Sequence, residues 1–155
     1  MTPAINLLKQ KKVDYKIHQY EHDADVASYG MEAAQKLGLD TRCVFKTLVV
    51  QLESVELAVA IIPVAEKLSM KRCAKALQAK KAVMAERALV ERTTGYVLGG
   101  VSPLGQKKRL RTLLDKSARE FSTIFVSAGR RGLEIELSPE NLLLLSNGKL
   151  ADLCI

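Results

Sequence analysis

The stretch Val44-Phe45-Lys46-Thr47-Leu48-Val49-Val50-Gln51-Leu52 decides the fold of this chain. Its β-branched and aromatic residues are typical of a strand. A second run of the same character, residues 56–62, follows after a short polar turn at Glu53-Ser54, and Pro63 should end it. Two such runs joined by a short turn predict a β-hairpin. We therefore expect this hairpin to form the centre of the structure.

Helices and further strands are predicted on both sides of the hairpin. Thr2-Pro3 is a helix start, Ser28-Tyr29-Gly30 opens a second helix that Gly38 closes, and Ser69 caps a third. The further predicted helices span 85–92 and 138–147, and the further predicted strands span 13–17, with one buried face, 110–114, 123–127 and 133–137. This order of hairpins and interspersed helices favours an α+β sheet or barrel-like core over regular βαβ alternation. Residues 1–155 are expected to form a single domain.

The composition favours an acidic partner. The chain has a formal net charge of +7, and the excess positive charge is clustered at 71–81, 107–111 and 130–131. Nucleic acid is the leading candidate, although basic surfaces are often only solvated. The three cysteines share no C-x-x-C spacing, which predicts neither a disulfide framework nor a zinc site. With no apolar run of membrane-spanning length, we expect a cytoplasmic protein with no membrane partner.

A glycine-rich loop that runs into positive charge is the first candidate site. Residues 93–106 contain Gly95, Gly99, Gly100 and Gly105, which allow positive φ or close approach of a ligand to the backbone. Directly after them come Lys107, Lys108, Arg109 and Arg111, which suit a phosphate backbone. The alternative interpretation is a turn followed by a solvated basic edge.

Lys46 is the candidate for chemistry, because a lysine among Val, Phe and Leu in a strand is either surface-exposed or a cation placed to hold a phosphate or carbonyl oxygen. His18 and His22 lie at a strand end and lack a third ligand, so we do not predict a metal site. No spacing in the sequence supports a Ser-His-Asp or Cys-His nucleophile.

The sequence also resembles the YbaK/EbsC family, which is related to the editing domain inserted in bacterial prolyl-tRNA synthetases. The resemblance runs nearly end to end, and the long loop motif is its most specific part. The matching segments are Thr2-Pro3-Ala4, Tyr20-Glu21-His22-Asp23, Lys36-Leu37-Gly38-Leu39, Phe45-Lys46-Thr47-Leu48, Ala58-Val59-Ala60, Lys75-Ala76-Leu77, Thr94-Gly95-Tyr96 and the loop from Gly99 to Arg109.

This resemblance implies a mixed, partly barrel-like sheet surrounded by helices, and hydrolysis in trans of cysteine wrongly attached to proline tRNA. It implies no metal or cofactor, and the prolyl-tRNA synthetase as a further partner. Lys46 matches the family's essential lysine, which holds the tRNA 3′ end. The implied substrate-binding residues are Tyr20, Tyr29, Thr47, Gly99, Gly100, Ser102, Pro103, Ser127 and Glu134, and the implied tRNA-binding residues are Lys107, Lys108, Arg109, Arg111, Arg130 and Arg131.

Tyr29 and Glu134 depart from the family pattern, which has Phe and Asp at these positions. The resemblance further implies that the substrate's own thiol attacks its ester and leaves as a cyclic thiolactone. An aminoacyl ester is already activated, so a site that positions it and stabilises the oxyanion needs no strong protein nucleophile. Two alternatives stay open: a deacylase for another ester such as Ala-tRNA(Pro), and a non-catalytic module that binds tRNA or the synthetase.

Overall fold

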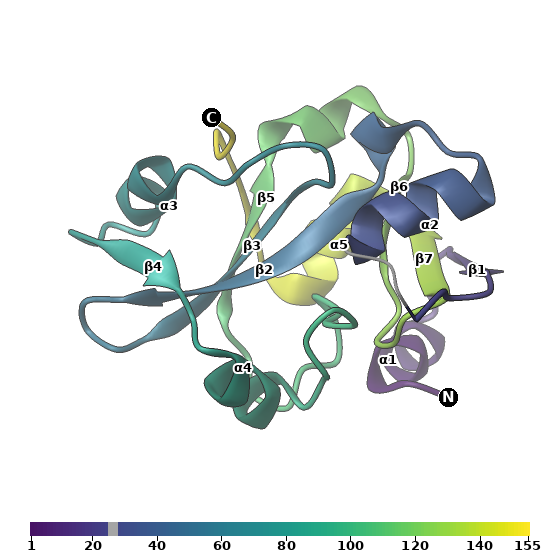
Figure 1. Ribbon diagram of the computed structural model, residues 1–155, viewed down its shortest axis with the longest axis horizontal. Coiled ribbons are helices and arrows are strands. Elements are labelled where there is room, and N and C mark those ends of the chain that lie inside the picture. The colour runs from purple at the N-terminus through teal and green to yellow at the C-terminus, as the bar shows by residue number, and fades with distance from the viewer. Residues whose placement is uncertain (25–27) are drawn as a thin grey trace.

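The computed structural model describes residues 1–24 and 28–155, and it contains two β-sheets with helices packed around them (Figure 1). One sheet has five strands in the order β4-β2-β3-β5-β8, and the other has three in the order β1-β7-β6. The strands are β1 (Lys16–Gln19), β2 (Phe45–Leu52), β3 (Leu57–Pro63), β4 (Ala82–Met84), β5 (Arg111–Asp115), β6 (Ile124–Ser127), β7 (Leu133–Leu137) and β8 (Lys149–Ala151).

The predicted hairpin is confirmed as the centre of the larger sheet. β2 and β3 pair antiparallel, with Lys46 opposite Ile62. β3 is buried along its whole length and pairs in parallel with β5, which makes the sheet mixed. Pro63 is the last residue of β3, as predicted. A proline has no backbone N–H to donate, so at the end of a strand it removes few of the sheet's hydrogen bonds.

The two sheets meet at the start of β2. A bridge between Val44 and Phe125 joins the residue before β2 to β6 of the smaller sheet. The described strands do not close into a barrel. The α+β class is confirmed, and the entry to β2 lies where the two sheets come together.

The predicted helices are confirmed, with small shifts at their ends. Thr2 accepts a hydrogen bond from the Ile5 N–H, and Ser138 accepts one from the Asn141 N–H. Gly38 ends the second helix with φ of 66°. The helices are α1 (Pro3–Lys11), α2 (Tyr29–Leu37), α3 (Met70–Ala76), α4 (Arg87–Thr94) and α5 (Pro139–Ser146), with short 3-10 turns η1 (Thr41–Cys43) and η2 (Lys116–Glu120). None of these helices is long and apolar enough to cross a bilayer.

The expectation of a strand over 13–17 with a buried face is wrong in its position. β1 begins at Lys16, and Ile17 is 37% exposed. The strand lies at the edge of the smaller sheet, where β7 is its one partner among the described strands, and the His18 ring lies 5.2 Å from that of Phe125. β4 and β8 are also absent from the prediction, because three residues are too few to show a period.

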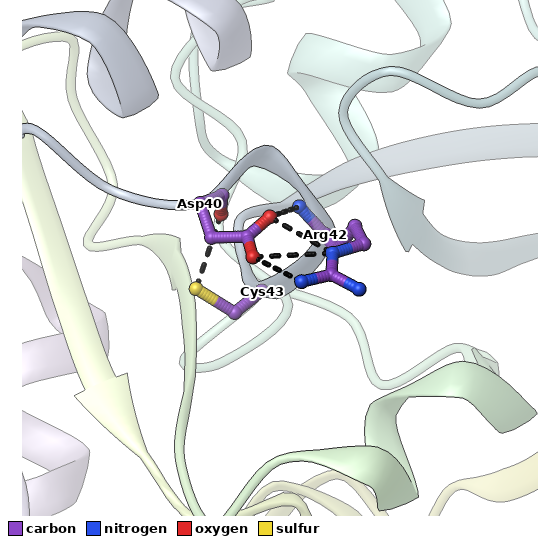
Figure 2. Close-up of polar contacts among 3 residues, drawn as sticks. All are labelled: Asp40, Arg42 and Cys43. Atoms are coloured by element: carbon purple, nitrogen blue, oxygen red, sulfur yellow. Dashed lines mark hydrogen bonds and ion pairs between the residues drawn. The ribbon is translucent and has the colours of Figure 1, made fainter.

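A polar turn leads the chain into β2. Asp40 accepts hydrogen bonds from the backbone N–H of Arg42 at 2.9 Å and from its guanidinium, and the Cys43 thiol donates to the Asp40 carbonyl (Figure 2). The pKa of Asp40 is lowered to about 2, mainly by the hydrogen bond from the Arg42 side chain and next by the one from the Arg42 backbone N–H. The turn is therefore held by a carboxylate that stays ionised, and Lys46 lies shortly after it.

Candidate active site

A cavity of about 290 Å³ lies where α2, the start of β2 and the glycine-rich loop meet β6 and β7. Its lining brings together Lys46, Tyr20, Tyr29 and Glu134, which belong to four separate segments of the chain. A larger hollow of about 630 Å³ lies between α1, residues 103–110 and α5, but its lining includes no carboxylate or histidine of the described chain. Because the smaller cavity brings a lysine, a buried carboxyl group and two phenols together, it is the candidate active site.

Lys46 and Thr47 enter the cavity from β2. Burial lowers the pKa of the Lys46 ammonium, and the charges of Cys154 and Glu66 act in the opposite direction. The Thr47 hydroxyl is buried and finds no hydrogen-bond partner in the described part of the chain. A partly desolvated cation and an unsatisfied hydroxyl can each bind an oxygen atom of a ligand more strongly than surface groups can.

Glu134 and Tyr20 supply neutral polar groups. Glu134 of β7 is 6% exposed, and desolvation raises its pKa to about 8. The pKa of the Tyr20 phenol is also raised, mainly by burial. Both groups are therefore protonated at pH 7, so each can donate a hydrogen bond to a ligand. Ser127 of β6 faces the same cavity, and its Oγ accepts from the Gly129 N–H at 3.1 Å.

Tyr29 and Arg131 form one wall of the cavity together with the glycine-rich loop. The guanidinium carbon of Arg131 lies 3.8 Å from the Tyr29 ring centroid, and Arg131 donates to the Leu98 carbonyl at 3.1 Å. Gly99 has φ of 93°, and a Cβ there would lie 2.4 Å from the Tyr29 ring. The loop can approach Tyr29 this closely only because residue 99 is glycine.

A partly buried contact between Glu32 and His22, which the sequence did not predict, lies beside Tyr29. Glu32 is 3% exposed, and its carboxylate accepts from the Asp23 N–H and contacts His22 Nδ1, both at 2.7 Å. Burial acts to raise the pKa of Glu32, but these two hydrogen bonds lower it overall. The His22 ring meets Tyr29 edge-on, with centroids 5.8 Å apart. The one signal in the sequence was the presence of His22 in the family-like Tyr20–Asp23 segment.

The rest of the glycine-rich loop lies outside the cavity. Gly100 packs against the Arg130 backbone, where a Cβ would lie 3.0 Å from the Arg130 Cα. Ser102 is fully buried, and its Oγ accepts from the Leu104 N–H. Pro103 lines the larger hollow. These residues fix the course of the loop, while Gly99 and Val101 face the cavity.

The predicted tRNA-binding residues fall into two groups. Arg130 and Arg131 line the cavity, but the 107–111 cluster does not. Arg111 forms a bidentate ion pair with Glu56 at 2.8 and 3.0 Å, and Arg109 donates to the Leu145 carbonyl. Lys107 and Lys108 are exposed.

Within the described residues, no group of three or more His, Cys, Asp or Glu side chains could hold a metal ion. His18 pairs instead with Glu136 at 2.8 Å. Only Cys73 of the three free cysteines is fully buried, while Cys43 and Cys154 are partly buried. Burial raises the pKa of all three thiols, to about 12 for Cys154, which is unfavourable for a nucleophile.

Comparison with known proteins shows similarity over almost the whole chain. Residues 23–145 match the family described as "Aminoacyl-tRNA editing domain". The chain is 41% identical to an Enterococcus faecalis protein named "Putative Cys-tRNA(Pro)/Cys-tRNA(Cys) deacylase EbsC", over 98% of this chain and 92% of that one. It is 26% identical to Bacillus subtilis YwhH, over 93% and 96%. A solved structure described as "a putative trans-editing enzyme for prolyl tRNA synthetase" shares the fold, with a TM-score of 0.83 and 21% identity over 100% of this chain and 99% of that one.

Proposed function

The chain belongs to the family of aminoacyl-tRNA editing domains, and from this premise we propose that it removes cysteine from mischarged proline tRNA in trans. The observation that carries the proposal is the convergence of Lys46, Thr47, Tyr20 and Glu134 on one small cavity. A single aminoacyl group at the end of a tRNA needs such a site, with few donors in a partly apolar space.

The cations at the cavity suit the tRNA 3′ end. Lys46 lies inside, and Arg130 and Arg131 lie on the same lining. We assign Lys46 to the terminal nucleotide and the two arginines to the phosphates next to it. Lys107 and Lys108 would add longer-range attraction, while Arg109 and Arg111 are partly committed to protein partners.

The proposed reaction uses the sulfur of the substrate. The cysteinyl thiol loses its proton, its sulfur attacks the ester carbonyl carbon, and the bond to the ribose oxygen breaks. The products are a cyclic thiolactone and a ribose hydroxyl that carries the transferred proton. The backbone at Gly99 and Val101, with Lys46, would stabilise the oxyanion, and protonated Glu134 would donate to the substrate. The route assigns no role to a metal ion.

Cysteine selectivity then comes from chemistry as well as fit. An apolar pocket alone separates side chains that differ by one methylene by only about 1–3 kcal/mol. Alanine lacks a thiol, so Ala-tRNA(Pro) would need a bound water as the nucleophile. The alternative of a non-catalytic module, which binds tRNA or the prolyl-tRNA synthetase, is disfavoured by the desolvated Lys46 and the buried, unpaired Thr47 hydroxyl in the described cavity.

Deacylation of a panel of proline tRNAs tests the proposal. Proline tRNA charged with cysteine, alanine, serine or proline is incubated with the protein, with and without prolyl-tRNA synthetase. We expect rapid loss of cysteine only. The rate of this loss should rise when the synthetase is added if the two proteins form a complex. Faster loss of alanine than of cysteine would show that Ala-tRNA(Pro) is the preferred substrate. Binding of tRNA without any deacylation would establish the non-catalytic alternative.

A further inference from the structure

The basic segment 71–81 takes no part in the cavity; its exposed side chains on α3 and in the turn after it, with Lys67 just before the helix, form a basic surface. We call this surface the α3 basic face. Its members share exposure to solvent, and Arg72 has a side-chain exposure of 51%. They are Lys67, Lys71, Arg72, Lys75, Lys80 and Lys81.

Most of these charges have no carboxylate partner. Arg72 pairs with Asp152 at 3.6 Å, but the five lysines form no ion pair within the described chain. The Glu53 carboxylate accepts from the backbone N–H groups of Lys80 and Lys81 at 3.1 and 3.3 Å and not from their ammonium groups. The 107–111 cluster differs, because its Arg111 is bound to Glu56. The α3 basic face therefore keeps more of its positive charge available to a partner.

The carboxyl-terminal segment connects this face with the cavity. Figure 1 shows the carboxyl terminus on the side of the larger sheet where α3 lies. The Ser69 N–H donates to the Leu153 carbonyl at 2.7 Å, the Ile155 N–H donates to the Lys67 carbonyl at 3.0 Å, and Arg72 donates to the Cys154 carbonyl. The chain also leaves β3 next to Lys46, because Phe45 lies opposite Pro63 and the Val64 N–H donates to the Val44 carbonyl at 2.9 Å, and Lys67 follows three residues later. The face thus begins close to the cation that the reaction uses.

We propose that the α3 basic face binds the phosphodiester backbone of the RNA whose 3′ end enters the cavity at Lys46. This inference rests on the proposed function. Lys71 and Lys75 lie one helical turn apart and so share a face of α3, and with Lys80 and Lys81 they offer point charges without base-reading side chains. Such a surface gives affinity that depends on salt and not on sequence. Identity of the tRNA would then be read elsewhere.

The test compares two variants with the same change in net charge. One carries Lys71→Gln, Lys75→Gln and Lys81→Gln, and the control carries Lys9→Gln, Lys11→Gln and Lys16→Gln, three exposed lysines of α1 and β1. Glutamine and lysine have similar helix propensity, so folding should be kept in both. The probe is an uncharged proline tRNA transcript, with binding measured between about 50 and 200 mM salt.

We expect the α3 variant to reduce the slope of log K against log salt by about 2 to 3, since each phosphate contact contributes about 0.7–0.9. The control should keep the wild-type slope. In single-turnover deacylation at saturating protein, the α3 variant should react at the wild-type rate, because the cavity is unchanged. Equal slopes for the α3 variant and the wild type would overturn the proposal, as would loss of synthetase binding with unchanged tRNA binding. Failure of the wild type to deacylate would count against the proposed function instead.

Discussion

Arg131 lies over the ring of Tyr29, with its guanidinium carbon 3.8 Å from the ring centroid. The pair encloses the cavity on the side of the glycine-rich loop, because Arg131 also donates to the Leu98 carbonyl. Gly99 fits between them only without a Cβ, since that atom would lie 2.4 Å from the Tyr29 ring and 2.9 Å from Arg131 Nε. The wall of the cavity therefore depends on one glycine, and its substitution is the sharpest probe of the wall.

Gly99→Ala should displace Tyr29 and Arg131 and reduce deacylation while the protein stays folded. Gly38→Ala is the matched control, because Gly38 also has positive φ but a Cβ added there would meet no atom within 4 Å. Both variants carry backbone strain of about 1–2 kcal/mol, which thermal unfolding would measure. Only Gly99→Ala should lose activity in single-turnover assays. Equal activity of the two variants would show that the wall is not needed.

Glu134→Gln should make stability less sensitive to pH. Burial raises the pKa of Glu134 from 4.5 to about 8, so the folded chain holds this proton more tightly than the unfolded chain does. The stabilising contribution is fully present below pH 4.5 and is lost as the pH rises to about 8. Relative to wild type, Glu134→Gln should gain of the order of 3 kcal/mol between about pH 4.5 and 7, as measured by urea unfolding.

Glu136→Gln provides the control for this experiment on the same strand. The hydrogen bond from Thr123 is the main cause that lowers the pKa of Glu136, followed in the same direction by that from His18. Its stabilising contribution is therefore present above the unfolded pKa and lost as the pH falls, which is the opposite sign. A pH-independent difference between Glu134→Gln and wild type would mean that Glu134 is already ionised in the folded protein.

The sequence predicted most of the fold because its elements carry strong local signals. The β2–β3 hairpin has β-branched residues on both strands, and α1 and α5 begin with a capping hydroxyl followed by proline. The strand near residue 15 was misplaced because alternation continues through Val13 and Tyr15, which precede β1. Periodicity shows which residues alternate, but the partner strand decides where pairing begins.

Several residues that line the candidate cavity were named in advance only through the family resemblance. Composition and spacing indicated Lys46 and the loop, but they could not bring Tyr20 to Ser127 and Glu134, because β1 pairs with β7 more than 100 residues later in the sequence. The Glu32–His22 pair was missed because its partners belong to a loop and a helix whose packing no local pattern encodes. The placement of Ser102 and Pro103 outside the cavity likewise follows from tertiary packing.

The source of the nucleophile can be tested by replacing all three cysteines. A variant with Cys43→Ser, Cys73→Ala and Cys154→Ser should keep the wild-type rate on Cys-tRNA(Pro), because each thiol has a raised pKa. Folding is checked first, since Cys73 is buried. Proline tRNA carrying S-methylcysteine should resist the enzyme. If the methylated ester is removed at the normal rate, a water molecule is the nucleophile and selectivity arises from fit around Tyr20 and Tyr29.

The measurement that tests the central claim most directly is single-turnover deacylation of Cys-tRNA(Pro) by Lys46→Ala, with Lys149→Ala as a control lysine on an exposed strand position. Both variants should fold, because neither side chain is part of the buried core. Lys46→Ala should lose on the order of 10²-fold or more in rate, as expected when one positioned charge is removed. Lys46→Arg should also be impaired, because a planar guanidinium does not replace a compact ammonium. Near wild-type activity of Lys46→Ala would contradict the account and place the chemistry outside this cavity.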